Sequence, residues 1–187
     1  YVETQYNADG ENHPTTDPTG VFPDMVQILN NDTNAVTGAC PAADVECFSE
    51  FLPTSGYTPS AMHFRFTARD LEGGNSFGDV TVTLAPGAGP FRVTSPDTQV
   101  TYPPGSQQTV TWNVAGTDLP PVSTANVMIS LSTDGGHTYP NVLAASTPND
   151  GSEVVTLPNT ETTTARVEVE AVGNIFFDVS NANFTIW

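Results

Sequence analysis

The chain has 187 residues and carries 21 Asp and Glu against four Lys and Arg, so its formal net charge is −17 at pH 7. All four cations are arginines, namely Arg65, Arg69, Arg92 and Arg166. This balance excludes ordinary nucleic-acid binding, which needs basic side chains to neutralise phosphates, and it argues against docking on anionic lipid. The lack of lysine also excludes Schiff-base chemistry. No run approaches about eighteen apolar residues, so we expect no insertion into a membrane.

Threonine, serine, asparagine, glycine and proline fill much of the remaining chain, a composition typical of an extracellular all-β protein. The first residues, Tyr1–Thr4, contain neither a basic region nor an apolar stretch. We therefore expect that any signal peptide has been removed, or that the chain was cut from a longer one.

The first region, residues 1–86, predicts few regular elements. An opening strand is allowed over 2–6, and apolar residues at helical spacing predict a helical turn within Asp24–Asn30. Alternating runs at His63–Arg69 and Asp79–Leu84 predict a hairpin around Asp70–Gly78. One face of this hairpin is strongly apolar, with Phe64, Phe66 and Ala68 on its first strand.

Three or four strands and a helical turn do not easily bury such a face. Either the first region packs on the second, or strands are missing from its N-terminal side. In the latter case another chain can supply a strand. The predicted partner surface is the exposed strand edge of 1–86, which would take a protein partner or a second copy of the chain.

Cys40 and Cys47 lie close together in a loop-like stretch. A redox pair is usually C-x-x-C, and a zinc site needs further Cys or His nearby; neither pattern is present. We therefore favour a loop-stapling disulfide, which implies an oxidising compartment, over a redox pair or half of a metal site.

Three small residues between two prolines, Pro86–Pro90, predict an inter-domain linker, which we place at 87–90. In the second region, 91–187, short alternating runs are separated by Pro, Gly, Asn and Asp. About a hundred residues of this pattern predict a sandwich of roughly seven strands. Trp112 alternates with Val110 and Val114, which favours a core position over a carbohydrate-stacking one.

Six runs of the second region carry a resemblance to a known module. They are Phe91–Pro96, Thr109–Thr117, Leu131–Pro140, Ala144–Ser152, Thr162–Glu170 and Gly173–Ile186. In this order they resemble the β-sandwich module that follows the catalytic domain in secreted bacterial reprolysin-like zinc metalloproteases. In the first region, Phe22–Pro23, Ile28–Asn30, Leu52–Thr54 and Phe64–Asp70 resemble the Ig-like or PKD-like module that precedes it there.

The resemblance implies an all-β chain of two tandem β-sandwich modules, Ig-like or fibronectin III-like, secreted or on the cell surface of a bacterium. The family's first module begins further upstream, so the first module here lacks N-terminal strands. The catalytic domain has no counterpart, since none of His13, His63 and His137 lies in an H-E-x-x-H motif. Protease activity does not carry over, and we expect no enzymatic activity from this chain.

Ser132, Asp134, Gly136 and Thr138 fit the Asp-box pattern S-x-D-x-G-x-T, which occurs in sialidases and many secreted β proteins. The aspartate can accept hydrogen bonds from turn N–H groups, and the glycine permits a positive φ. We predict a structural turn here rather than a ligand site.

Oxygen-rich loops are candidate calcium sites, because Ca²⁺ takes six to eight hard oxygen ligands. The candidate ligands are Asp9, Glu11, Asp32, Asp70, Glu72, Asp79 and Asp150. None has EF-hand spacing, and the alternative at each is a turn-forming carboxylate in water. Bound cations would also relieve the repulsion of a strongly acidic chain.

These features predict a non-catalytic extracellular module, structural or adhesive, that presents β-sandwich surfaces. A second hypothesis makes the chain a subunit of an extracellular filament, assembled when a neighbour adds a strand to the first region. A third makes it the accessory, substrate-positioning part of a secreted metalloprotease.

Overall fold

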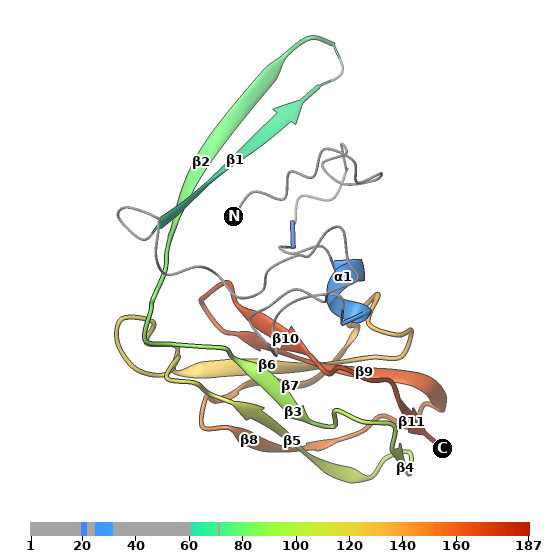
Figure 1. The fold of residues 1–187 in the computed structure, drawn as a ribbon. Coiled ribbons are helices and arrows are strands. Elements are labelled where there is room, and N and C mark those ends of the chain that lie inside the picture. The colour runs from blue at the N-terminus through green and yellow to red at the C-terminus, as the bar shows by residue number, and fades with distance from the viewer. Residues whose placement is uncertain (1–19, 22–24, 32–60, 71) are drawn as a thin grey trace, which may run out of the picture.

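The computed structural model describes residues 20–21, 25–31, 61–70 and 72–187. In these residues the fold is built of strands, with one five-residue helix, α1 (Met25–Leu29). The all-β prediction is therefore confirmed. Two sheets face each other in the second region, and a separate hairpin belongs to the first region (Figure 1).

The larger sheet of the second region has six strands in the order β4-β11-β9-β6-β7, with β10 also paired to β9. Its strands are β4 (Thr101–Tyr102), β6 (Asn126–Ser132), β7 (Asn141–Pro148), β9 (Thr162–Ala171), β10 (Phe177–Val179) and β11 (Phe184–Ile186). The pairs are antiparallel except β11 with β4, which is parallel. The smaller sheet is β3-β5-β8, made of β3 (Arg92–Ser95), β5 (Gln107–Asn113) and β8 (Ser152–Thr156).

The core lies between these two sheets, because alternate residues of each strand point inward. Its buried members are Val93, Val110, Trp112, Val127, Ile129, Leu131, Val155, Leu157, Ala165, Val167, Val169, Phe184 and Ile186. The predicted core position of Trp112 is confirmed. Its indole Nε1 donates a hydrogen bond of 2.9 Å to the buried Asn149 Oδ1.

The first region contributes a β-hairpin, β1 (Ala61–Arg69) and β2 (Asn75–Thr83), paired antiparallel in register from Ala61↔Thr83 to Arg69↔Asn75. The predicted turn was too long, because residues 75–78 continue β2 and pair with the end of β1. The hairpin forms its own two-stranded sheet, and Figure 1 shows it extending from the linker away from the sandwich.

The predicted linker Pro86–Pro90 carries no strand, and Gly89 N–H donates to the Ala115 carbonyl at 2.8 Å. The division into two modules stays a prediction. The predicted opening strand and both cysteines, Cys40 and Cys47, lie outside the described residues. Within the described ranges, no helix has the length and apolar character needed to cross a membrane.

Candidate functional site

The β1–β2 hairpin presents two chemically different faces, because successive residues of a strand point to opposite sides. Directly opposed residues share a face, and the cross-strand pairs Met62↔Val82, Phe64↔Val80, Phe66↔Gly78 and Ala68↔Ser76 make one face apolar. We call this set the apolar face of the hairpin. The pairs His63↔Thr81, Arg65↔Asp79 and Thr67↔Phe77 belong to the other, polar face.

Much of the apolar face is open to solvent toward the tip of the hairpin. Phe66 is 54% exposed and Val80 is 51% exposed, whereas Met62, near the base, is buried. Side chains of this kind scattered singly over a surface need no explanation, but here they lie on one face of one small sheet. The exposed part therefore has the character of an interaction surface.

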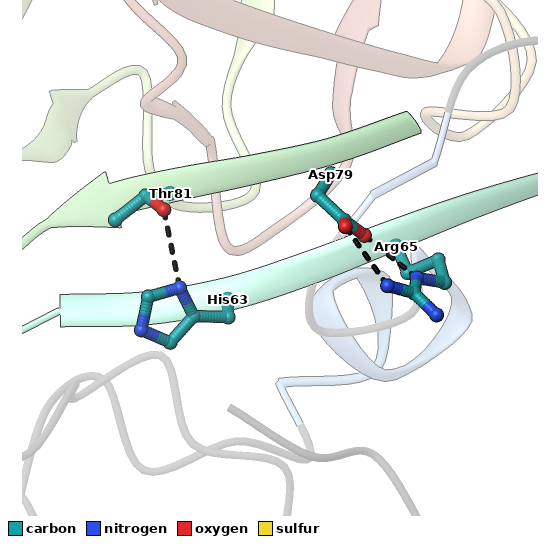
Figure 2. Close-up of polar contacts among 4 residues, drawn as sticks. All are labelled: His63, Arg65, Asp79 and Thr81. Carbon is teal, nitrogen blue, oxygen red and sulfur yellow. Dashed lines mark hydrogen bonds and ion pairs between the residues drawn. The ribbon is translucent and has the colours of Figure 1, made fainter. Parts of the chain in front are cut away.

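The polar face is held together by interactions between side chains (Figure 2). Arg65 makes a two-pronged ion pair with Asp79, Nε to Oδ1 at 2.7 Å and Nη2 to Oδ2 at 2.8 Å. His63 Nδ1 and Thr81 Oγ1 are hydrogen-bonded at 3.1 Å. The Arg65 guanidinium also lies 4.1 Å from the centre of the Phe77 ring.

The side chains of Arg65 and Asp79 are each 57% exposed, so the contribution of the pair to stability is small. The hydrogen bond from Arg65 lowers the pKa of the Asp79 carboxyl, and the same bond raises the pKa of Arg65. The pair keeps the long arginine side chain on the polar face. The contrast between the two faces of the hairpin is thereby maintained.

Two candidate calcium ligands of this region, Asp70 and Asp79, have protein partners. Asp70 Oδ1 accepts backbone N–H bonds from Glu72 and Gly74, both at 2.9 Å, and so caps the turn of the hairpin. Asp79 is bound by Arg65 on the neighbouring strand. In the part of the chain that the structure describes, no three acidic, histidine or cysteine side chains come together as a metal site.

The remaining candidate ligands add no described cluster. Asp150 is exposed, and its Oδ1 accepts from the Ser152 N–H at 3.4 Å. Asp9, Glu11 and Asp32 lie outside the described residues, as do Cys40 and Cys47. Calcium binding and the disulfide both stay predictions.

The turn between β6 and β7 is organised by Asp134. Its Oδ1 accepts from the Ser132 hydroxyl at 2.7 Å and from the Thr138 N–H at 2.9 Å, and its Oδ2 accepts from the Thr138 hydroxyl at 2.6 Å. Ser132 Oγ in turn accepts from the Gly136 N–H at 2.8 Å. The hydroxyl bonds from Thr138 and Ser132 hold the pKa of Asp134 far below its usual range.

Every oxygen of the Asp134 carboxylate thus accepts hydrogen bonds from the turn itself, an arrangement suited to closing a tight connection. Gly136 is buried and has φ +98°, a conformation that side-chain-bearing residues rarely adopt. The structural-turn role stays a prediction for Ser132, Asp134, Gly136 and Thr138. The hydrogen bonds of Asp134 and the positive φ of Gly136 are the features on which such a turn would depend.

Arg166 takes part in an arrangement that local sequence patterns do not predict. It lies on β9, on the outer face of the larger sheet, yet only 8% of it is exposed. Its Nε donates to Asn183 Oδ1 at 2.8 Å and its Nη1 donates to the Ser180 carbonyl at 2.9 Å. The one signal in the sequence was a cation within a strand whose alternate residues are Ala165, Val167 and Val169.

Comparison with known proteins gives no assignment: no protein-family model, no curated protein and no solved structure matches the chain. The likeness to modules of reprolysin-like metalloproteases therefore rests on the residues that carry it.

Proposed function

We propose that the chain is a non-catalytic structural or adhesive module, secreted or displayed on a bacterial cell surface, that offers a hairpin to a companion protein surface. The observation that carries this proposal is the exposed part of the apolar face, where Phe66 and Val80 are each more than half exposed. The sandwich, in contrast, buries its own core between two sheets. The sandwich serves as the rigid body and the hairpin as the point of attachment.

The physical reason for a companion surface is the small size of the hairpin sheet. A two-stranded hairpin is marginally stable in water unless a further strand or a packed layer covers it. Complete burial of an apolar side chain such as Phe or Val stabilises by about 1.5–3 kcal/mol, so covering Phe66 and Val80 favours association. The proposed non-catalytic character rests on the sequence, in which no H-E-x-x-H motif occurs.

A second candidate function is the subunit of an extracellular filament joined by strand complementation. Among the described residues, no strand other than β2 pairs with β1, and none other than β1 pairs with β2. Neither strand contains lysine or proline, which commonly block strand edges. A neighbour that adds a strand head-to-tail makes a contact that does not close and therefore propagates.

The accessory role in a metalloprotease stays an expectation of the resemblance alone. Calcium, if it binds, would stiffen loops of such a module. A melting-temperature series with added calcium and with chelator tests this, because a cation that binds only the folded state raises the melting temperature.

The proposed attachment by the apolar face is tested with two matched variants, Phe66→Ser and Phe77→Ser. Both phenylalanines lie in the hairpin and are similarly exposed, at 54% and 59%, but they belong to opposite faces. Sedimentation velocity over a concentration series measures self-association. We expect Phe66→Ser to weaken association by roughly tenfold or more, equivalent to about 1.4 kcal/mol, and Phe77→Ser to leave it near the wild-type value.

Equal association of both variants and wild type would contradict attachment by the apolar face. Negative-stain images of the wild-type chain separate the candidates, because strand complementation predicts elongated particles and symmetric pairing predicts discrete ones. A wild-type chain that is monomeric at every concentration removes the filament candidate.

A further inference from the structure

The outer face of the larger sheet is buried where alternation predicts a solvent-facing surface. Ser130 and Ser132 on β6 and Arg166 on β9 point away from the core-facing residues Ile129, Leu131 and Val167, yet they are buried as well. Helix α1 lies over this sheet, on the side away from β3-β5-β8 (Figure 1). Groups on this outer face therefore contact α1.

The first part of this contact is a depression at Gly136 that receives the side chain of Leu29. Leu29 is only 8% exposed. A Cβ added at Gly136 would overlap Leu29 Cδ2 and would lie 3.1 Å from Tyr139 Oη. The missing side chain of Gly136 is thus what makes room for the leucine.

The second part is the guanidinium of Arg166. Its Nη2 donates to the backbone carbonyl of Leu29 at 3.1 Å, across 137 residues of sequence. The last carbonyls of a helix have no partner within the helix, so an external donor satisfies one of them. Arg166 itself needs this acceptor, because the other groups to which it donates hydrogen bonds, Asn183 Oδ1 and the Ser180 carbonyl, are also uncharged.

The third part fixes the chain directly after the helix. Asn31 has φ +55°, which ends the helix, and its Nδ2 donates to the Asn181 carbonyl at 2.9 Å. Asn181 is held from behind by Asp97, whose Oδ1 accepts from the Asn181 N–H at 2.6 Å and whose Oδ2 accepts from the Asn181 Nδ2 at 3.0 Å. The side chain and carbonyl of Leu29 and the side chain of Asn31 are therefore all bound by groups on the sandwich.

We propose that the surface formed by Gly136, Tyr139, Arg166 and Asn181 is a binding site for a short helical turn ending in leucine. Its occupant is α1 of the same chain, which becomes helical only when docked. A five-residue helix is far too short to be stable in water by itself, so its folding must be coupled to this contact. The site latches the N-terminal region onto the sandwich, independently of the hairpin's attachment role.

Hydrogen-exchange mass spectrometry on the full chain tests this latch through the amides of residues 25–31, two of which are bonded within the turn, Asn30 N–H to Val26 O and Asn31 N–H to Ile28 O. Gly136→Ala places a methyl group against Leu29. Gly173→Ala is its matched control, because Gly173 also has a positive φ, +78°, but nothing lies within 4 Å of an added Cβ. We expect exchange at 25–31 to accelerate at least tenfold in Gly136→Ala and to stay near the wild-type rate in Gly173→Ala.

Leu29→Ala removes the helix side chain that fills the depression at Gly136 and leaves the sandwich sequence intact. It therefore tests the latch even if Gly136→Ala also loosens β6 and β9. Its control is Val26→Ala on the same helix, at a side chain that is 54% exposed. Acceleration at 25–31 in Leu29→Ala, with β6 and β9 unchanged, supports the proposal. Wild-type exchange at 25–31 in Leu29→Ala, or unprotected amides there in the wild-type chain, overturns it.

Discussion

The outer face of the larger sheet raises the pKa of one of its side chains, Glu168 on β9. Glu168 is partly buried beside Ser130 of β6, and Glu170 is a second carboxylate on the same face of its strand. Burial, and to a lesser extent the charge of Glu170, raises the pKa of Glu168 to about 7. Tyr139, in the α1 contact, lies near enough to interact with both Glu168 and the Arg166 cation.

This pKa predicts a stability that falls as pH rises. The folded chain holds the Glu168 proton up to about pH 7, whereas the unfolded chain releases it near its ordinary value of 4.5, so the penalty on folding builds up between these two pH values and is complete above about pH 7. Since one pKa unit corresponds to about 1.4 kcal/mol and the side chain is not fully buried, we expect a penalty of roughly 1–3 kcal/mol.

Glu168→Gln removes the titrating group, so this part of the pH dependence should disappear. Urea unfolding at about pH 5 and about pH 8, one value on each side of the Glu168 pKa, measures it. The variant should be more stable than wild type at the higher pH and close to it at the lower one. An equal stability difference at both values would show that the pKa of Glu168 is not raised in the folded chain.

Some elements of this fold are determined by residues close in sequence, and others by contacts between residues far apart in sequence. The β1–β2 hairpin and the inward positions of β5, β6 and β9 follow from alternation over a few residues, so the sequence predicts them well. The hydrogen bonds of the Asp134 turn join residues at most four apart, and the motif alone suggests them. The predicted length of the hairpin was less accurate, because the pairing of residues 75–78 depends on β1 rather than on their own sequence.

The α1 contact could not be predicted in this way. Helical spacing indicates the turn at Met25–Leu29, but its docking joins Leu29 to Arg166 across 137 residues. Alternation also predicts that the outer residues of β6 and β9 face water, and only the folded arrangement shows Ser130, Ser132 and Arg166 buried. Such contacts depend on how whole elements pack, which local patterns do not encode.

The Asp134 carboxylate should stabilise the turn between β6 and β7. Asp134→Asn keeps the shape of the side chain but removes the charge, and it replaces one acceptor oxygen by an amide. Because the carboxylate accepts from Ser132 and Thr138, we expect a loss of about 1–3 kcal/mol in the free energy of unfolding at neutral pH.

Urea unfolding measures this loss, and Asp150→Asn is the control, since Asp150 is exposed and has a single long backbone contact of 3.4 Å. Asp150→Asn should lie within about 0.5 kcal/mol of wild type. Equal effects of the two substitutions would mean that Asp134 does not organise the turn.

At the scale of the whole molecule, a net charge of −17 opposes any association between copies. The hairpin is the favourable place for contact, because two of the four arginines, Arg65 and Arg69, lie in β1. Charges on two copies repel over about a Debye length, roughly 30 Å at 0.01 M salt and roughly 8 Å at 0.15 M. The apolar face does not depend on this screening.

Self-association through the hairpin should therefore strengthen as salt is raised from about 0.01 M to about 0.15 M. Sedimentation velocity at both salt concentrations measures the change, with Phe66→Ser as the variant that should gain little. Association that weakens with salt in the wild-type chain would indicate attachment by charge pairs instead of by apolar burial.

Hydroxyl-radical footprinting of Phe66 over a protein concentration series tests the central claim most directly, because it reads the solvent exposure of this side chain. The account predicts heavy labelling of Phe66 in the dilute chain and protection as the companion surface arrives at high concentration, with the buried Met62 protected throughout. A dilute monomer in which Phe66 is already shielded would show that the first region covers its own sheet, and this result would contradict the account.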